Sequence, residues 1–235
     1  ALARQTELPD HRELSFEDRL GLLIEHEIVD RQSHRLAQRL RRTRLPQTAT
    51  LEDLDLRTPR GLDRAALKQI ASLAWIDQHA AVLIVGPTGV GKSYLACALG
   101  HAACRADHSV RCFRIAHLVE TLARATALQQ RSRLLKQLAR IDLLIIADVG
   151  LAPLSDQPVR DLLDILDDRY QRAATLITSQ LPVDQWHAYL GNPTLADAIL
   201  DRLVHHAHRL VLSGESMRKQ RRDVMRSTPP SSSAG

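Results

Sequence analysis

Aromatic side chains are scarce in this 235-residue chain, where phenylalanine, tyrosine and tryptophan together make up 3%. Rows of aromatic rings stack the bases of single-stranded nucleic acid, so a single-strand binding platform is not indicated. No apolar run approaches the roughly 20 residues of a membrane span, and we expect no signal sequence. We therefore expect a cytoplasmic protein without membrane contact. Whether residues precede Ala1 stays open, because the chain does not begin with methionine.

Cysteine and lysine are also rare. The three cysteines, Cys97, Cys104 and Cys112, show no CxxC spacing, so we interpret them as buried thiols in a reducing compartment. Nearly all of the 32 basic residues are arginine, and the formal net charge is +5. A basic balance permits binding to nucleic acid without establishing it.

The remaining composition, 44% hydrophobic and 25% charged, is that of a globular protein with one core and a small appendage. Ser15 is a candidate N-cap, with Asp18 three residues on, and apolar residues then recur at helical spacing until Pro46 ends the pattern. We expect three parts: a helical arm over 1–60, the main domain over 61–226, and a disordered tail over 227–235.

From residue 81, short apolar segments alternate with segments of helical periodicity. Strands that alternate with helices in this way predict an α/β fold with a parallel sheet flanked by helices. The expected strands are 81–85, 110–115, 142–146, 174–178 and 208–212, and the expected helices are 62–75, 92–105, 116–125, 131–139, 156–171 and 194–206.

The string "GPTGVGKS" after the first strand fits the phosphate-loop pattern GxxxxGK[ST] at every defined position. Glycines let successive N–H groups point at phosphate oxygens, and the following helix adds its positive end. The lysine reaches the β- and γ-phosphates, and the serine hydroxyl binds Mg²⁺. ATP and Mg²⁺ are therefore the expected cofactors. The predicted nucleotide contacts are Gly86, Pro87, Thr88, Gly89, Val90, Gly91, Lys92 and Ser93.

The run "LLIIADVG", residues 143–150, contains one acid where two adjacent acids are usual. In phosphate-loop ATPases the first acid lies near Mg²⁺ and the second orients the attacking water. Either Asp148 is the water-activating acid and the metal acid is missing at Ala147, or the strand is shifted by one residue and Asp148 serves the metal. A shift would turn the other side chains over, so we favour the first account; both remain open.

In either account the remaining Mg²⁺ ligands are Ser93, phosphate oxygens, water and, in the second, Asp148, since Mg²⁺ commonly retains several waters. We therefore expect nucleotide binding to survive and hydrolysis to suffer more.

The chain resembles the IstB-like ATP-binding proteins, AAA+ helpers encoded beside the transposase in a family of bacterial insertion sequences and related to DnaC-type helicase loaders. The resemblance covers almost the whole chain. In this family two acids usually precede the turn, so the alignment puts Ala147 where the metal acid belongs. The strings that carry the resemblance are "TLEDLDLRTPRGLD" (50–63), "GPTGVGKSYLACALGHAACRA" (86–106), "GLAPLSDQ" (150–157), "LLDILDDRY" (162–170), "TSQLPVDQWH" (178–187), "PTLADAILDRLVHHAHR" (193–209) and "GESMRK" (214–219).

The resemblance also implies roles for three further residues. Gln180, with Ser179 next, matches the polar residue that senses the γ-phosphate. Arg202 matches the arginine finger offered to ATP on a neighbouring subunit, and its alternative is a surface arginine paired with Asp201 or Asp197. Arg218 resembles a second sensor arginine, and its alternative is an exposed residue of a basic tail.

Three arginine-rich segments are candidates for DNA binding. Residues 31–44 hold six arginines and no acid, and Arg31, Arg35 and Arg39 share one helix face with Arg42 close by. Such a stripe suits contacts with DNA phosphates. The alternative interpretation is a basic helix face that contacts only solvent. The second candidate is Arg131, Arg133 and Lys136, and the third is 218–222.

Taken with the resemblance, these features predict a transposition helper that binds ATP and assembles as a homo-oligomer on double-stranded DNA. It would deliver that DNA to the transposase of the same element, with ATP controlling assembly. The alternatives are a DnaC-like helicase loader, and a DNA-binding adaptor that holds ATP without hydrolysing it.

Overall fold

The computed structural model describes residues 14–56, 58, 60–204 and 207–217, and within them five strands form one sheet in the order β2-β3-β4-β1-β5. Every neighbouring pair of strands is parallel, so the carboxyl ends of all five strands lie at one edge of the sheet. This confirms the predicted α/β class. The strands are β1 (Ala81–Val85), β2 (Val110–Arg114), β3 (Leu143–Val149), β4 (Ala174–Ser179) and β5 (Ala207–Val211).

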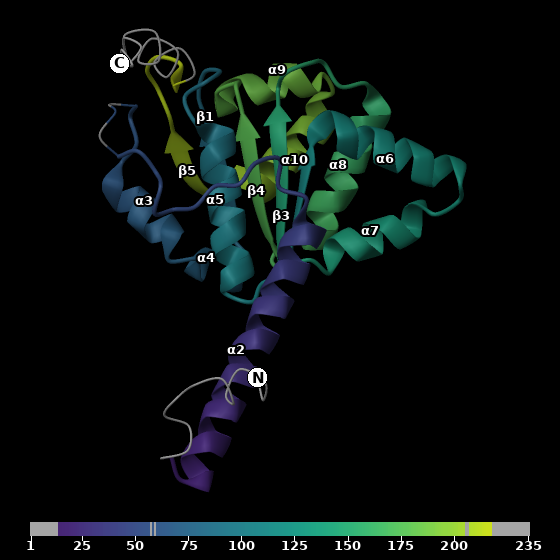
Figure 1. Cartoon of the computed structure of the whole chain (residues 1–235). Helices are drawn as coiled ribbons and strands as arrows, with labels where there is room; N and C mark the ends of the chain where they lie inside the picture. Colours follow the sequence, from purple (N-terminus) through teal and green to yellow (C-terminus); the bar gives the residue numbers. More distant parts are fainter. Residues whose placement is uncertain (1–13, 57, 59, 205–206, 218–235) are drawn as a thin grey trace, which may run out of the picture.

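Helices cover both faces of the sheet (Figure 1). Side chains alternate between two buried clusters: Val82 and Ile84 of β1 belong to one, and Leu83 to the other. One face packs against α3 (Arg64–Ala71), α4 (Ala74–Asp77), α5 (Lys92–Arg105) and the end of α2 (Phe16–Thr43). The other packs against α6 (Ile115–Ala127), α7 (Arg131–Ala139), α8 (Asp156–Arg169), α9 (Trp186–Leu190) and α10 (Pro193–Val204), with the 3₁₀ turn η2 (Val183–Gln185) ahead of α9.

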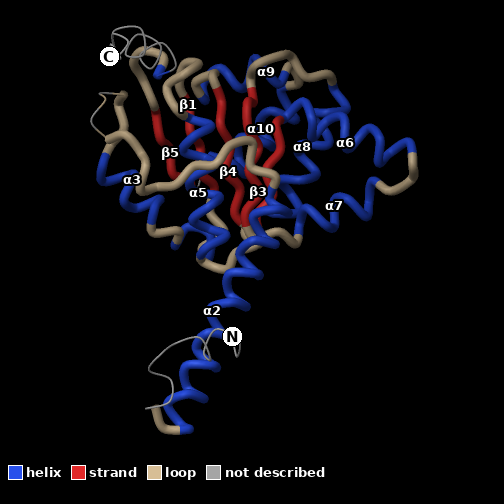
Figure 2. Tube along the Cα trace, viewed as in Figure 1, coloured by secondary structure: helices blue, strands red, loops and turns tan. Residues whose placement is uncertain are grey.

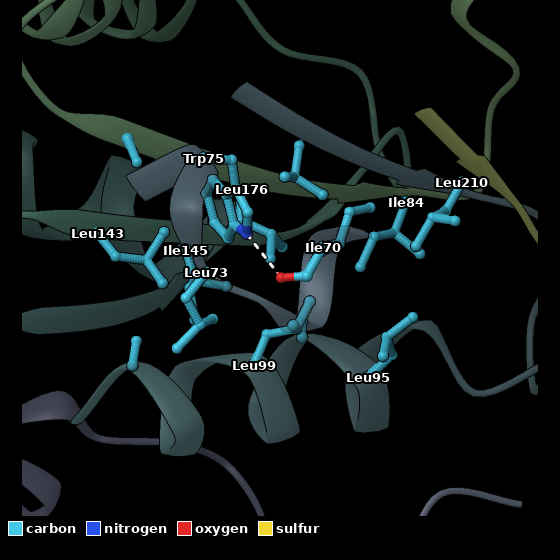
Figure 3. Close-up of a cluster of buried hydrophobic side chains, with 14 of the residues drawn as sticks. Ile70, Leu73, Trp75, Ile84, Leu95, Leu99, Leu143, Ile145, Leu176 and Leu210 are labelled. Atoms are coloured by element: carbon cyan, nitrogen blue, oxygen red, sulfur yellow. Dashed lines mark hydrogen bonds between the residues drawn. The ribbon is translucent and has the colours of Figure 1, made fainter. Parts of the chain in front are cut away.

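The first cluster is centred on Trp75, which is 2% exposed and donates its indole N–H to the carbonyl of Ile70 at 2.9 Å (Figure 3). Leu99 of α5 and Leu176 of β4 lie in the same cluster. A buried indole is stable when its N–H has an acceptor. The contact therefore fixes the short helix α4 against α3, where the sequence predicted one helix over 62–75. That prediction is wrong, because Leu73 lies between the two helices with a φ of 62°.

Helix α2 begins as predicted at Ser15, whose side chain accepts a hydrogen bond from the Asp18 amide at 3.1 Å. Its C-terminal end packs on the sheet layer through Leu36 and Leu40, and its N-terminal part projects away from the body (Figure 1). Apolar side chains such as Phe16 are exposed on the projecting part. No helix within the described ranges is long and apolar enough to cross a membrane.

The loop between α2 and α3 passes across α5 (Figure 2). Leu45 packs so close to Gly100 that an added Cβ would lie 3.1 Å from its Cδ2 atom. Further along, Glu52 accepts a hydrogen bond from Arg105 at 2.7 Å. The loop thus joins the arm to the nucleotide end of the sheet along the surface of α5.

The three cysteines are buried and free, as predicted. Burial raises the pKa of Cys97 and Cys104, and raises the pKa of Cys112 to about 12. Neutral thiols are poor nucleophiles, so the three side chains serve packing rather than chemistry.

At the amino edge of the sheet, Arg169 of α8 is 1% exposed and binds the starts of two strands. Its guanidinium donates to the Ile141 carbonyl at 2.8 Å and to the Thr175 hydroxyl at 3.1 Å, and it also binds the carbonyls of Leu138, Asp142 and Ala174. Burial lowers the pKa of Arg169 to about 10, which leaves the group charged at neutral pH. One cation therefore joins the end of α7, the start of β3 and the start of β4 through five acceptors.

We predict that Arg169→Leu lowers the free energy of unfolding by about 3 kcal/mol, because it removes five hydrogen bonds at a buried site. Urea denaturation followed by circular dichroism measures the change. The control is Arg172→Gln, at an exposed position three residues on, where we expect a change within about 0.5 kcal/mol. Equal effects of the two substitutions would contradict this role for Arg169.

Candidate nucleotide-binding site

Four segments that are distant in sequence meet at the carboxyl edge of the sheet. The phosphate loop 86–91 follows β1, Asp148 ends β3, Gln180 follows β4, and 212–217 follows β5. Hydrogen bonds link them: the Gly86 amide donates to the Ser179 carbonyl at 3.2 Å. In open α/β sheets this edge is where ligands bind.

The phosphate loop has the backbone that its glycines predict. Gly86 has a φ of 148° and Gly91 a φ of 99°, and Gly91 is the N-cap of α5. Such values are costly for residues with a Cβ, and the resulting turn forms a concave set of N–H groups at a helix N-terminus. The loop therefore fits the phosphates of a nucleotide.

Lys92 lies folded over the loop. Its ammonium donates to the carbonyls of Gly86 at 2.7 Å and Pro87 at 2.8 Å, and the residue is 6% exposed. Burial lowers the pKa of Lys92, and the nearby charge of Asp148 partly opposes that shift. Phosphate oxygens, being negative like Asp148, would also raise the pKa of Lys92 and so favour its charged form.

The outer side of the loop is packed by other segments. A Cβ added to Gly86 would lie 2.1 Å from the Leu212 carbonyl oxygen, and the Met217 amide donates to the Gly89 carbonyl at 3.0 Å. A Cβ added to Gly91 would lie 2.7 Å from Nη1 of Arg60. Glycine is thus required at positions 86 and 91 for two reasons: neighbouring atoms leave no room for a Cβ, and the backbone φ is positive. Arg60 could not be predicted from the sequence as a neighbour of the loop, because it lies about 30 residues before Gly91 and no local pattern links the two.

Strand β3 runs past Ala147 to Val149, further than predicted, through an irregularity. Ile146 pairs with Ile177 of β4, but Val149 pairs with Ser179, so β3 carries one extra residue between these pairs. Asp148 lies in this bulge with a φ of 65°, and its amide donates to the Thr178 hydroxyl at 3.1 Å. Because of the bulge, the end of β3 is shifted by one residue against β4 while the residues before the bulge keep their faces of the sheet.

The cost on which we based the preference between the two roles of Asp148 is therefore absent. The structure therefore allows Asp148 to bind a metal as readily as to orient water.

Ala147 is 4% exposed and lies opposite Arg114, the last residue of β2. The Arg114 Nε lies 3.5 Å from a carboxylate oxygen of Asp148. Sequence analysis missed Arg114, because the alignment of β2 with β3 is a tertiary feature. Within the described residues no group of three histidine, cysteine or acidic side chains could hold a metal. A Mg²⁺ ion would be held by Ser93, Asp148, phosphate and water, which fits a cation that retains waters.

Of the two residues that match the γ-phosphate sensor, Gln180 is the better placed. The Ser179 hydroxyl accepts from the Leu181 amide at 3.0 Å and donates to its carbonyl at 3.1 Å, so it is used in a local turn. Gln180 is half-buried at the end of β4, beside the start of the phosphate loop. Arg218 lies outside the described residues.

Arg202 lies at the opposite, amino edge of the sheet, near the end of α10, where it lines a cavity of about 230 Å³ together with Ala81. The five residues of β1 separate it from its own phosphate loop by roughly 16 Å. Arg202 therefore cannot serve the nucleotide of its own subunit. Its guanidinium pairs with Asp167 of α8 and lies 3.7 Å from Asp201.

The ion pair with Asp201, which was the alternative prediction for Arg202, is thus observed. A second ion pair, with Asp167, was not predicted. Asp197, the other predicted partner, lies 3.4 Å from His187 instead.

Only part of the predicted arginine stripe on α2 is free of other contacts. Arg31 donates to Glu27 at 2.7 Å. Arg39 donates to the Cys104 carbonyl at 2.8 Å and pairs with Asp107, so it holds α2 on the C-terminal end of α5. Arg35 and Arg42 are exposed.

The second basic segment divides in the same way. Arg131 pairs with Asp161, which is 5% exposed, and with Asp164. These carboxylates raise the pKa of Arg131. A guanidinium committed to two acids is poorly suited to phosphate contacts, whereas Arg133 and Lys136 are exposed. The third basic segment, 218–222, lies outside the described residues.

Comparison with known structures supports the fold. The structure is similar to the DnaC helicase loader, with a TM-score of 0.59 and 19% identity over 70% of this chain and 97% of that one. It is also similar to the replication initiator DnaA bound to AMPPCP and single-stranded DNA, with a TM-score of 0.60 and 15% identity over 78% of this chain and 56% of that one. The chain therefore shares its fold with the DnaC loader and the DnaA initiator.

Sequence comparison is more specific. A Sinorhizobium fredii protein named as an ATP-binding protein of an insertion sequence is 52% identical over 213 residues, covering 91% of this chain and 87% of the relative. The corresponding protein named for insertion sequence IS21 of Pseudomonas aeruginosa is 34% identical over 88% of this chain and 78% of the relative. The family described as IstB-like ATP binding protein matches residues 1–224. The chain therefore belongs to the IstB-like ATP-binding proteins of insertion sequences.

Proposed function

We propose that the chain binds Mg–ATP at the phosphate loop and assembles with copies of itself on double-stranded DNA. It then presents that DNA to the transposase of its insertion sequence. The observation that carries the nucleotide part is the meeting of the phosphate loop, Asp148 and Gln180 at the carboxyl edge of one parallel sheet. Family membership and the names of the relatives support the transposition part.

In this proposal the loop amides and Lys92 bind the triphosphate, and Ser93 with Asp148 would hold Mg²⁺. Gln180 reads the γ-phosphate from the end of β4. ATP supplies a ligand whose hydrolysis can reverse assembly. Lys92 must first exchange its hydrogen bonds to Gly86 and Pro87 for phosphate oxygens, so binding replaces contacts that the loop already makes.

Arg202 acts between subunits, because its place at the amino edge excludes contact with its own loop. A guanidinium from a neighbouring copy neutralises charge on the γ-phosphate and makes assembly depend on the bound nucleotide. For this, Arg202 must break its ion pair with Asp167 and bind the γ-phosphate instead.

The DNA contacts are assigned to those of the predicted DNA-binding residues that are exposed and have no ion pair within the described ranges: Arg35 and Arg42 on α2, and Arg133 and Lys136 on α7. Contacts from such side chains to phosphates position a protein on DNA without reading its sequence.

A second candidate function is a non-hydrolysing adaptor that uses ATP only as a structural ligand. It is favoured by buried Ala147 and by Arg114, whose cation lies beside the one remaining acid. A cation there competes with Mg²⁺ for Asp148 and leaves the binding loop intact.

We predict that the natural chain binds ATP and turns it over slowly with DNA, and that Ala147→Asp raises turnover about tenfold or more by supplying a metal carboxylate. Phosphate release with double-stranded DNA measures turnover, with ATP binding followed in parallel. Lys92→Ala is the control and should abolish both. Turnover in the natural chain equal to that of Ala147→Asp would show that Asp148 suffices, and absent turnover in the natural chain would favour the adaptor.

For Arg202 we expect that Arg202→Ala abolishes ATP-dependent assembly on DNA while a single subunit binds ATP within about twofold of the natural affinity. Sedimentation with and without ATP measures assembly. Asp167→Asn is the matched control, because it breaks the same ion pair and keeps the arginine. If both variants lose assembly equally, Arg202 acts through the pair with Asp167 and the proposal for it is wrong.

For DNA, the pair Arg35→Gln and Arg42→Gln should weaken binding to all sequences alike. It should lower the slope of log affinity against log salt by about 1.8, or about 0.9 for each lost phosphate contact. Fluorescence anisotropy with a duplex measures the slope. Arg131→Gln serves as the control that leaves the slope unchanged, since its guanidinium is bound to Asp161 and Asp164. An unchanged slope in the double variant would remove these residues from the DNA surface.

A further inference from the structure

Arg60, in the loop between α2 and α3, is a buried cation for which the described part of the chain supplies no counter-ion. It is 5% exposed, forms no ion pair within the described ranges, and its Nε has no hydrogen-bond partner there. Its two terminal nitrogens donate to the carbonyls of Asp55 and of Val90, the latter at 3.5 Å. By contrast, Arg169, the other buried arginine, binds five acceptors. A charge buried with so few partners is costly unless an anion comes close.

The contact to Val90 decides the direction of a peptide group in the phosphate loop. In a trans peptide the C=O and the next N–H point in opposite directions. Arg60 holds the Val90 carbonyl from the outer side of the loop, so the Gly91 N–H points to the inner side. That N–H is one of the donors that a phosphate loop directs at the phosphates.

The position of Gly91 agrees with this role. Its Cα faces the guanidinium so closely that a Cβ would lie 2.7 Å from Nη1. The absent side chain thus makes room for a cation against the loop backbone, as well as for the positive φ. The guanidinium adds positive potential behind the N–H groups, which favours an anion in front of them.

Arg60 also ties the loop to two other segments. Its carbonyl accepts from the Ser213 amide at 2.8 Å, after β5, and its guanidinium holds the Asp55 carbonyl in the chain that comes from α2. The phosphate loop is therefore braced against both neighbouring segments through one residue, by its main chain on one side and its side chain on the other.

We propose that Arg60 is a positioning residue of the nucleotide site: it orients the Val90–Gly91 peptide of the phosphate loop and supplies the positive charge behind it. This deepens the proposed function and rests on the nucleotide binding stated there. The ligand it favours is the phosphate chain rather than the base. Binding of the phosphates should therefore depend on Arg60 while binding of the nucleoside does not.

The test compares Arg60→Met, which keeps the apolar stem without the charge, with Arg60→Lys and with the control Arg64→Met. Arg64 begins α3, is exposed and lines the same surface hollow of about 240 Å³ as Arg60. Binding of ADP, inorganic pyrophosphate and adenosine is measured by competition with a fluorescent ADP, in EDTA so that metal sites do not contribute.

We expect Arg60→Met to weaken ADP and pyrophosphate about tenfold and adenosine less than twofold. Arg60→Lys should fall between Arg60→Met and the natural chain, and Arg64→Met should match the natural chain. Equal weakening of ADP and adenosine, or unchanged ADP binding, would overturn the proposal. If circular dichroism shows that Arg60→Met does not fold, the test rests on Arg60→Lys, for which the weakening of ADP binding is compared with the weakening of adenosine binding.

Failure of the proposed function looks different in this experiment. If the natural chain itself does not bind ADP or pyrophosphate, nucleotide binding is wrong. If the natural chain binds them, Lys92→Ala does not, and the Arg60 variants bind normally, only the role of Arg60 is wrong.

Discussion

The rest of the site depends on close packing against the outer side of the phosphate loop. Gly86 lies against the backbone of Leu212, Gly89 receives the amide of Met217, and Gly91 faces Arg60. These contacts leave no room for a side chain at the glycines, and two of them occupy loop carbonyls, those of Gly89 and Val90. The shape of the loop is therefore set jointly by its own glycines and by two segments far away in the sequence, Arg60 and 212–217.

The charge at the end of β3 differs from the usual arrangement at two residues. Ala147 removes a carboxylate next to the metal position, and Arg114 brings a guanidinium to within 3.5 Å of the acid that remains. Both changes make the region less negative, which disfavours a Mg²⁺ ion there and favours an anionic phosphate. The loop and Lys92 keep their own contacts, which supports the proposal that the chain can bind a nucleotide even where hydrolysis is slow.

Arginine has a mainly structural use in parts of the chain that read as basic surface. Arg39 fastens the arm helix to the C-terminal end of α5, where a cation is favoured by the helix dipole. Arg131 joins α7 to α8 through Asp161. A guanidinium suits this work because its several donors reach carbonyls and carboxylates together. Exposure and pairing, rather than spacing along a helix, separate such residues from candidates for DNA.

The sequence by itself determined the alternation of strands and helices, the phosphate loop, the arm helix with its cap at Ser15 and the family, because local periodicity and ordered motifs carry them. It did not determine the bulge at Asp148, the break at Leu73, or the partners of Arg60, Arg114 and Arg202. Those depend on which strands become neighbours and in what alignment. Only the tertiary structure decided them, because contacts between distant segments leave no periodic trace in a single sequence.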